Sequence, residues 1–138
     1  MCIRDRSKAS NRAQDRGQIR TLLGRLCRFH LWEPNSFGMH KAMTHEDALK
    51  EHGPGIKRAY TYKALNKLIQ GSAADMTKKA MLELYKEKII PHIQIHDELD
   101  LSIENEDEAK KVIEIMEHAV TLEVPNKVDM NMETIGGK

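Results

Sequence analysis

Residues 64–104 decide the fold: ALNKLIQGSAADMTKKAMLELYKEKIIPHIQIHDELDLSIE. In the first part of this stretch, apolar residues recur three and four positions apart, which predicts a helix from about Tyr60 to Lys88 with one apolar face. Pro91 cannot continue a helix, and the alternation of apolar and polar residues after it predicts a β-hairpin. The expected apolar face of the helix consists of Leu65, Leu68, Ile69, Ala73, Met76, Ala80, Met81 and Leu84.

The predicted hairpin carries a histidine and two acids where its strands meet, namely His96, Asp97 and Glu98. A loop over 97–99 would pair Ile95 with Leu101 and gather the apolar residues on one face. A two-residue loop at Asp97 and Glu98 would mix the two faces, so we expect the three-residue loop. The apolar face would then anchor the hairpin in the core and leave a polar tip with two carboxylates.

Adjacent carboxylates in a tight turn repel each other, and binding a cation relieves that repulsion. Mg²⁺ prefers oxygen ligands and typically takes one or two carboxylates together with substrate phosphates. A solvated acidic turn is the alternative, because Asp is common in turns. The local pattern leaves both interpretations open.

A polar stripe runs along the predicted helix, because Tyr62, Asn66 and Gln70 are four residues apart and Lys63 and Lys67 flank them. Asn and Gln can donate to the minor-groove acceptors that all base pairs present, which gives a contact blind to sequence. A solvated helix face is the alternative interpretation.

Gly71 and Ser72 follow this stripe in the middle of the helix. Glycine there costs about 1 kcal/mol relative to alanine. A small residue at this position indicates that another backbone, of protein or of nucleic acid, approaches closely.

Outward from this stretch, the sequence predicts further elements on both sides. Expected are a helix end in 7–16, a hairpin in 18–31 turning at Gly24 and Arg25, a loop or insertion over 33–57 with a short helix at 45–51, a helix capped by Asn105 and Glu108 that runs to about Leu122, and a last strand at 128–132. This order predicts an α+β fold with helices packed on an antiparallel sheet.

Charge is segregated along the 138 residues, although the formal net charge is only +1. Residues 1–34 and 55–91 each hold eight basic residues against three acids, whereas 92–124 hold ten acids against Lys110 and Lys111. Basic blocks suggest a polyanionic partner, although a solvated surface is the simpler explanation of each block taken alone. Two distant cysteines fit a reducing cytoplasm, and no apolar run approaches the ~20 residues of a membrane span.

The first six residues, MCIRDR, match a translated transposon end used in sequencing libraries. We therefore expect residues 1–6 to be an artefact and 7–138 to be the C-terminal part of a larger domain. The expected parts are a helix end and hairpin (7–32), an insertion (33–57), a long helix (58–90), a second hairpin (91–104), and a final helix and strand (105–138).

Three stretches, in order, resemble the C-terminal end of a family A DNA polymerase, the group of bacterial DNA polymerase I and many phage replicative enzymes. RAQDRGQIRTLLGR resembles the segment that ends in the family's T-x-x-GR hairpin. ALNKLIQGSAADMTKKAM resembles its N-x-x-x-QG-[TS]-AAD helix, and IQIHDELDLSIE resembles its third polymerase motif. The resemblance covers nearly everything from Asn11 to Lys138. The stretch TYKALNKLIQGSAAD is more similar to phage enzymes than to bacterial ones.

The resemblance implies a partial palm and fingers of a polymerase that joins a dNTP to a primer 3′-hydroxyl with two Mg²⁺ ions. By the family pattern, Asp97 and Glu98 are catalytic acids at the metal, and His96 contacts the primer end. Primer–template DNA is then the partner of five further residues, and the enzyme works in the cytoplasm, that of the host if phage-encoded. These DNA-binding residues are Gln70, Asn66, Arg25, Lys63 and Lys67.

The chain also departs from the family pattern. Tyr62 stands where bacterial members usually have an arginine. The insertion matches nothing in the family, and its histidines at 40, 45 and 52 lack the spacing of a zinc site. The motifs D-Y-S-x-x-E and R-x₃-K-x₇-YG are missing, so we expect a fragment that is inactive without the N-terminal part of the polymerase. The alternatives are a non-catalytic DNA-binding module and a small metal-dependent nuclease, which would need a further ligand beside Asp97 and Glu98.

Overall fold

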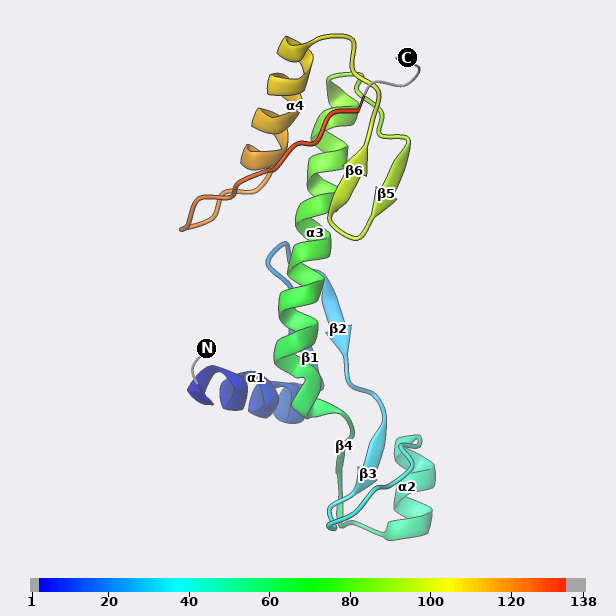
Figure 1. Cartoon of the computed structure of the whole chain (residues 1–138). Coiled ribbons are helices and arrows are strands. Elements are labelled where there is room, and N and C mark those ends of the chain that lie inside the picture. The colour runs from blue at the N-terminus through cyan, green and yellow to red at the C-terminus, as the bar shows by residue number, and fades with distance from the viewer. Residues whose placement is uncertain (1–2, 134–138) are drawn as a thin grey trace. The chain divides into compact units, whose positions relative to one another are not determined.

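The computed structural model describes residues 3–133 and has the expected α+β composition (Figure 1). Its strands form three separate two-stranded antiparallel ladders, β1–β2, β3–β4 and β5–β6, so the expectation of one antiparallel sheet is wrong for this part of the chain. The chain divides into two compact units, Met1–Ser72 and Ala73–Lys138, and the boundary falls within helix α3. The elements are α1 (Ile3–Arg16), β1 (Gln18–Arg20), β2 (Leu26–Arg28), β3 (Trp32–Pro34), α2 (His45–His52), β4 (Ile56–Arg58), the 3₁₀ turn η1 (Thr61–Lys63), α3 (Ala64–Lys86), β5 (Ile93–Ile95), β6 (Glu98–Asp100) and α4 (Glu106–His118).

A small apolar core holds the first unit together. Its buried residues come from α1, from the hairpin β1–β2 with the residue that follows it, and from the start of α3. Helix α1 ends at Arg16, and Gly17 follows it with a φ of 66°, a left-handed conformation that glycine adopts at no steric cost. The core residues are Ala13, Ile19, Phe29 and Ala64, with Ala9, Cys27 and Leu68 packed against them.

The predicted hairpin in residues 18–31 is confirmed. Gln18 pairs with Arg28 and Arg20 pairs with Leu26, so the loop comprises the five residues from Thr21 to Arg25. Thr21 N donates to Arg25 O (2.9 Å) and closes this loop. The turn is therefore wider than a tight Gly-Arg turn.

The insertion is closed at its base by two strands that the sequence pattern did not predict. Trp32 in β3 pairs with Arg58 in β4, and the guanidinium of Arg58 also lies over the Trp32 ring, 4.6 Å from its centroid. Arg58 further donates to Gln14 O (3.1 Å) and Phe29 O (3.0 Å), which ties the base of the insertion to the first unit's core region. The short helix expected at 45–51 is confirmed as α2.

Helix α3 confirms the long helix but not all of its predicted apolar face. Ile69 is 48% exposed and Ala73 is also exposed, whereas Ala80 and Leu84 are buried. The helix ends before Pro91, because Lys88 takes a left-handed φ of 63° and its N–H donates to Tyr85 O. Together with the Ile89 N to Leu84 O bond, this is a Schellman motif with lysine at the position that usually holds glycine.

The expected register of the second hairpin is wrong. Ile95 pairs with Glu98 and Ile93 with Asp100, so the loop is the two residues His96 and Asp97. His96 adopts a positive φ of 54°, the requirement for the first loop residue of a type II′ turn, which suits strand twist. The apolar face therefore does not anchor the hairpin, and Ile93 and Ile95 remain 55% and 50% exposed.

Helix α4 begins as predicted and ends earlier than predicted. Glu108 N donates to Asn105 Oδ1 (2.9 Å), while the Glu108 side chain accepts from Glu104 N (2.8 Å) instead of the cap's own N–H. The helix ends at His118, whose ring bonds the Glu114 carbonyl (2.8 Å), not near Leu122.

The last strand expected at 128–132 is absent from the part of the chain that the structure describes. Val128 N, which would have to join a ladder, donates to Glu117 Oε1 (3.0 Å) on α4. This bond holds the chain beside α4 as an extended segment without a partner strand (Figure 1).

Candidate active-site hairpin and DNA-facing helix

The β5–β6 hairpin places His96, Asp97 and Glu98 at one exposed tip. Asp97 is the second loop residue, and Glu98 opens β6. The structure records no hydrogen bond or ion pair for the carboxylate of either acid within residues 3–133, so their oxygen atoms are available to a ligand from outside. Gln94 Nε2 donates to His96 O (3.1 Å) and braces the turn from the strand before it.

The carboxylates of Asp97 and Glu98 fit a magnesium site whose other ligands come from outside the described residues. Carboxylate oxygens are the ligands that Mg²⁺ prefers, and one or two protein carboxylates suffice when substrate phosphates supply others. Among the described residues, no group of three or more His, Cys, Asp or Glu side chains could hold a metal ion. A nuclease that relies on this chain alone would need such a group.

The predicted polar stripe lies on the surface of the first unit. Tyr62, Asn66 and Gln70 are all exposed, with Tyr62 at 57%. No hydrogen bond from the Asn66 or Gln70 side chain is recorded within residues 3–133, so both amides are free to meet a ligand. The stripe is therefore an accessible row of donors on a helix.

The two lysines beside the stripe rest on aromatic rings. Lys63 Nζ lies 5.1 Å from the Tyr60 ring centroid and 5.6 Å from that of Tyr62. Lys67 Nζ lies 5.0 Å from the Phe29 centroid. These cation–π contacts hold both charges on the flank of the stripe.

Arg25 is exposed, and its guanidinium group also bonds the helix. Its Nη2 donates to the carbonyl oxygen of Gly71 (2.9 Å), the residue that follows Gln70. Leu22 N, in the same loop, donates to Ser72 Oγ (2.9 Å). The sequence pattern did not reveal these two contacts, although the unexplained glycine in the helix pointed to a close neighbour.

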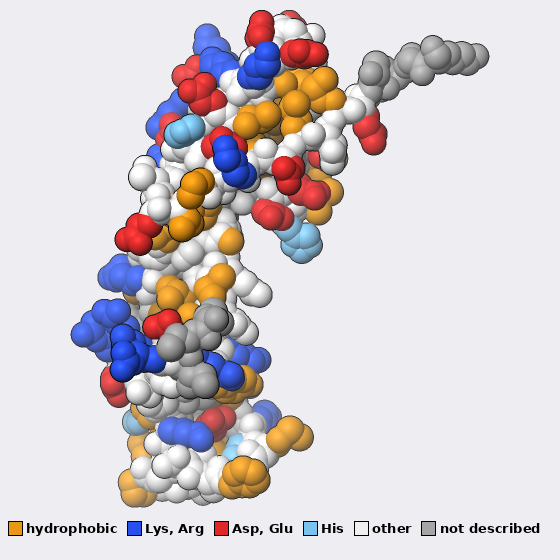
Figure 2. Space-filling model, turned by 60° about the vertical axis from the view of Figure 1, so that its left-hand side comes forward, with side chains coloured by type: hydrophobic (Ala, Val, Ile, Leu, Met, Phe, Trp, Pro, Cys, Tyr) orange, Lys and Arg blue, Asp and Glu red, His pale blue; other side chains and the backbone are white. Residues whose placement is uncertain are grey.

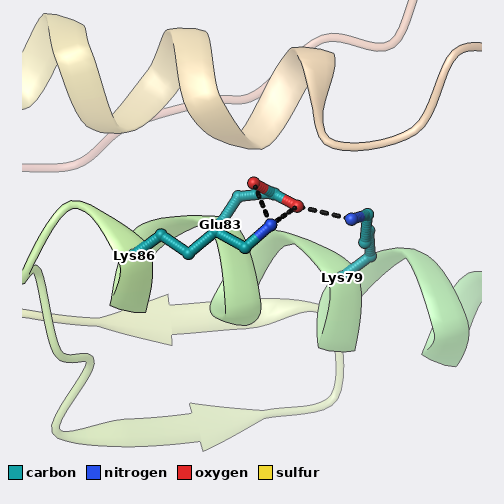
Figure 3. Close-up of polar contacts among 3 residues, drawn as sticks. All are labelled: Lys79, Glu83 and Lys86. Atoms are coloured by element: carbon teal, nitrogen blue, oxygen red, sulfur yellow. Dashed lines mark hydrogen bonds and ion pairs between the residues drawn. The ribbon is translucent and has the colours of Figure 1, made fainter.

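In the second unit, Glu83 of α3 binds two lysines of its own helix (Figure 3). Its carboxylate accepts from Lys79 and, at 3.0 and 3.1 Å, from Lys86. The hydrogen bond from Lys79, followed by that from Lys86, lowers the pKa of Glu83 below its usual value. Lys111 of α4 bonds Glu87 (2.7 Å), just past the end of α3.

Charged side chains differ between the two units on the face that Figure 2 shows. In the upper part of the view acids and lysines are interleaved, whereas lysine and arginine gather in its lower half. The insertion's histidines contact other rings: His45 meets Trp32 (4.7 Å between centroids) and His40 meets His52 (6.5 Å).

No helix of the described residues is long and apolar enough to cross a membrane.

The geometry of the exposed acidic tip and of the amide stripe is compatible with several functions, and sequence comparison identifies the family. The profile of DNA polymerase family A matches residues 6–135. The chain therefore belongs to DNA polymerase family A.

Individual relatives agree with this assignment. A DNA-directed DNA polymerase of Pseudomonas phage M6 is 35% identical over 121 residues, which cover 88% of this chain and 15% of that protein. DNA polymerase I of Bacillus subtilis (strain 168) is 47% identical over 75 residues, covering 48% of this chain and 8% of that protein. The chain thus spans a small part of the length of these relatives.

A solved structure also matches. The POL domain of Pol1 from M. smegmatis, in complex with DNA primer-template and dNTP, is similar with a TM-score of 0.58 and 28% sequence identity. The match covers 88% of this chain and 20% of that one.

Proposed function

We propose that the chain is the C-terminal part of a DNA-directed DNA polymerase, with a partial palm and fingers, that extends a primer with dNTPs. The observation that carries this proposal is the pair of unpartnered carboxylates, Asp97 and Glu98, at the tip of a tight hairpin in a family A chain. A tip without internal ion pairs keeps its charge for a ligand. The complex of the M. smegmatis relative with DNA primer-template and dNTP supports the same substrates here.

Each tip residue has a distinct role in this proposal. Asp97 is a metal ligand, Glu98 is the auxiliary acid beside it, and His96 contacts the primer end. Asp97, with Glu98 beside it, would hold Mg²⁺, and two such ions would supply activation of the primer 3′-hydroxyl and stabilisation of the charge that develops on the attacking and leaving oxygens. The two-residue turn places the three residues next to one another at the tip of the hairpin.

The helix stripe holds the DNA in this proposal. Asn66 and Gln70 donate to minor-groove acceptors of the primer–template duplex, and Lys63 and Lys67 lie near its phosphates. Arg25 belongs to the same surface. Because these contacts do not read the base sequence, the helix can bind every template that the enzyme copies.

The remaining metal-binding aspartate and the triphosphate-binding fingers helix come from another part of the polymerase. We propose that this chain does not catalyse extension by itself, since its described residues offer no third metal ligand. The phage relative supports a phage-encoded enzyme that works in the host cytoplasm. As a module it would still bind DNA, with an affinity that falls steeply with salt.

Substitution of Asp97 in the full-length polymerase tests this function. Asp97→Ala should abolish primer extension while the Kd for primer–template DNA changes less than about twofold, because the metal acts on the reacting atoms and not on duplex binding. Asp100→Ala is the matched control, an exposed acid in strand β6 of the same hairpin. Near-normal extension by Asp97→Ala, or an equal loss with Asp100→Ala, would refute the metal-ligand role.

A further inference from the structure

We propose that the loop Thr21–Arg25 interlocks with helix α3 at Gly71 and Ser72, and that this interlock positions Gln70 for DNA. The interlock itself follows from contacts within one unit of the chain, Met1–Ser72. Its effect on DNA rests on the function proposed above. Arg25 is then a positioning residue that acts through Gln70.

Two hydrogen bonds join the loop to the helix at successive residues. Arg25 Nη2 donates to Gly71 O, and Leu22 N donates to Ser72 Oγ, both at 2.9 Å. Ser72 Oγ in turn donates to Leu68 O (2.7 Å), so the hydroxyl is fixed on the helix before it accepts from the loop. The loop is therefore held at two points, one on each side of the Gly71–Ser72 peptide bond.

A steric contact completes the interlock. A Cβ atom built on Gly71 would lie 2.8 Å from Thr21 Cγ2 and 3.7 Å from Arg25 Nη2. Carbon atoms in ordinary contact are 3.5–4.0 Å apart, so any larger residue at 71 collides with the threonine methyl. The close neighbour that the mid-helix glycine admits is thus the hairpin loop of the protein itself.

The threonine methyl cannot easily move aside. Thr21 is 7% exposed, and its Oγ1 accepts from Arg25 N (3.0 Å), which fixes the side-chain rotamer. Because β-branched side chains have few χ1 alternatives, turning the methyl away would break that bond. The collision must then be relieved by moving the loop away from α3.

Gln70 immediately precedes the interlocked residues and has its side chain in solvent. A carbonyl bound by Arg25 restrains the peptide that begins at Gly71, and with it the turn of helix that presents Gln70. Moving the loop would shift this turn, and a displacement of about 1 Å is enough to weaken a hydrogen bond to a base edge.

The interlock can be tested on the chain as it stands, by thermal unfolding of three variants. Alanine in place of glycine within a helix would normally raise the Tm of a chain of this size by about 4 °C. Gly71→Ala should lower the Tm instead. In the Thr21→Ser background, which removes the methyl and keeps the hydroxyl, Gly71→Ala should raise the Tm instead. A Tm that rises equally in both backgrounds would overturn the interlock and would indicate that glycine is required by the DNA.

Positioning of Gln70 is tested by primer–template binding in the full-length polymerase. Arg25→Met should raise the Kd about fivefold, the value of one hydrogen bond, and should add nothing in the Gln70→Ala background. The slope of log Kd against log salt concentration should be the same for Arg25→Met as for the unchanged polymerase. Additive effects with a slope reduced by about one phosphate contact would overturn the proposal and make Arg25 a direct phosphate ligand.

The two experiments separate the inference from the proposed function. If Gln70→Ala leaves the Kd unchanged, Gln70 does not bind DNA and its positioning by Arg25 is refuted. The reversal of the Tm effect then still decides whether the loop and α3 interlock, because unfolding does not depend on DNA.

Discussion

Ile95 lies directly opposite Glu98 in the β5–β6 ladder, so His96 must make the turn in a left-handed conformation with φ of 54°. This conformation costs a non-glycine residue about 1 kcal/mol. The tip therefore stores a small strain beneath the residue that we propose contacts the primer end.

Replacing this histidine should separate stability from activity. His96→Gly should raise the free energy of unfolding of the chain by about 0.5 kcal/mol, because glycine accepts the positive φ. In the full-length polymerase the same change should slow primer extension about tenfold, through loss of a contact of about 1.4 kcal/mol. His96→Asn, which also tolerates this conformation, is the control for the turn. Unchanged extension in His96→Gly would exclude a primer contact.

The stripe makes a prediction about DNA affinity. Gln70→Ala should raise the Kd for primer–template DNA about fivefold, equally for A·T-rich and G·C-rich templates, since the acceptors are common to all base pairs. Lys67→Met, which removes a charge beside the stripe, should instead lessen the salt dependence of binding. Fluorescence anisotropy at several salt concentrations distinguishes the two. A Gln70→Ala loss confined to one base composition would contradict a sequence-blind contact.

Glu83 predicts a pH dependence of stability. Its bonds with Lys79 and Lys86 lower its pKa in the folded state, so the stabilisation is present above the ordinary value of 4.5 and is lost as the pH falls through the lowered one. Glu83→Gln should therefore lower the Tm at pH 7 and have no effect at low pH, below the lowered pKa. Added salt should shrink the difference. Glu114→Gln, an exposed α4 acid, should show no such pH profile.

The end of α3 offers a stabilising substitution. Lys88 occupies the left-handed position of the Schellman motif, where glycine avoids the clash of a Cβ with the backbone. Lys88→Gly should raise the free energy of unfolding by about 1 kcal/mol in thermal or urea unfolding. Lys88→Ala keeps the Cβ and should give no gain. An equal gain from alanine would attribute the effect to the lost charge.

The sequence predicted the elements whose signals are local. The spacing of apolar residues gave α3, and Asn105 with Glu108 gave the start of α4. The positions of the β5–β6 hairpin and of the stripe also followed from pattern. In each case the relevant residues are neighbours in the chain, so propensity and geometry coincide.

Features that depend on distant residues were missed. The register of the β5–β6 hairpin depends on a positive φ at His96. The alternation of apolar residues does not reveal this backbone conformation. The strands β3 and β4 pair residues separated by the whole insertion, and Pro34 in β3 disfavours a strand by local criteria. The strand predicted at 128–132 does not form, because Val128 N donates to Glu117 on α4 instead of to a neighbouring strand.

The paired base of the insertion has a consequence for how this part of the chain can change over time. Trp32 and Arg58 hold the two ends of the segment side by side, whatever lies between them. Lengthening a segment whose two ends are paired costs little chain entropy, about 0.6 kcal/mol for each doubling of the number of residues in it. Descendants could therefore exchange α2 and its flanking loops for a short turn or a new module, while the start of helix α3 keeps its place.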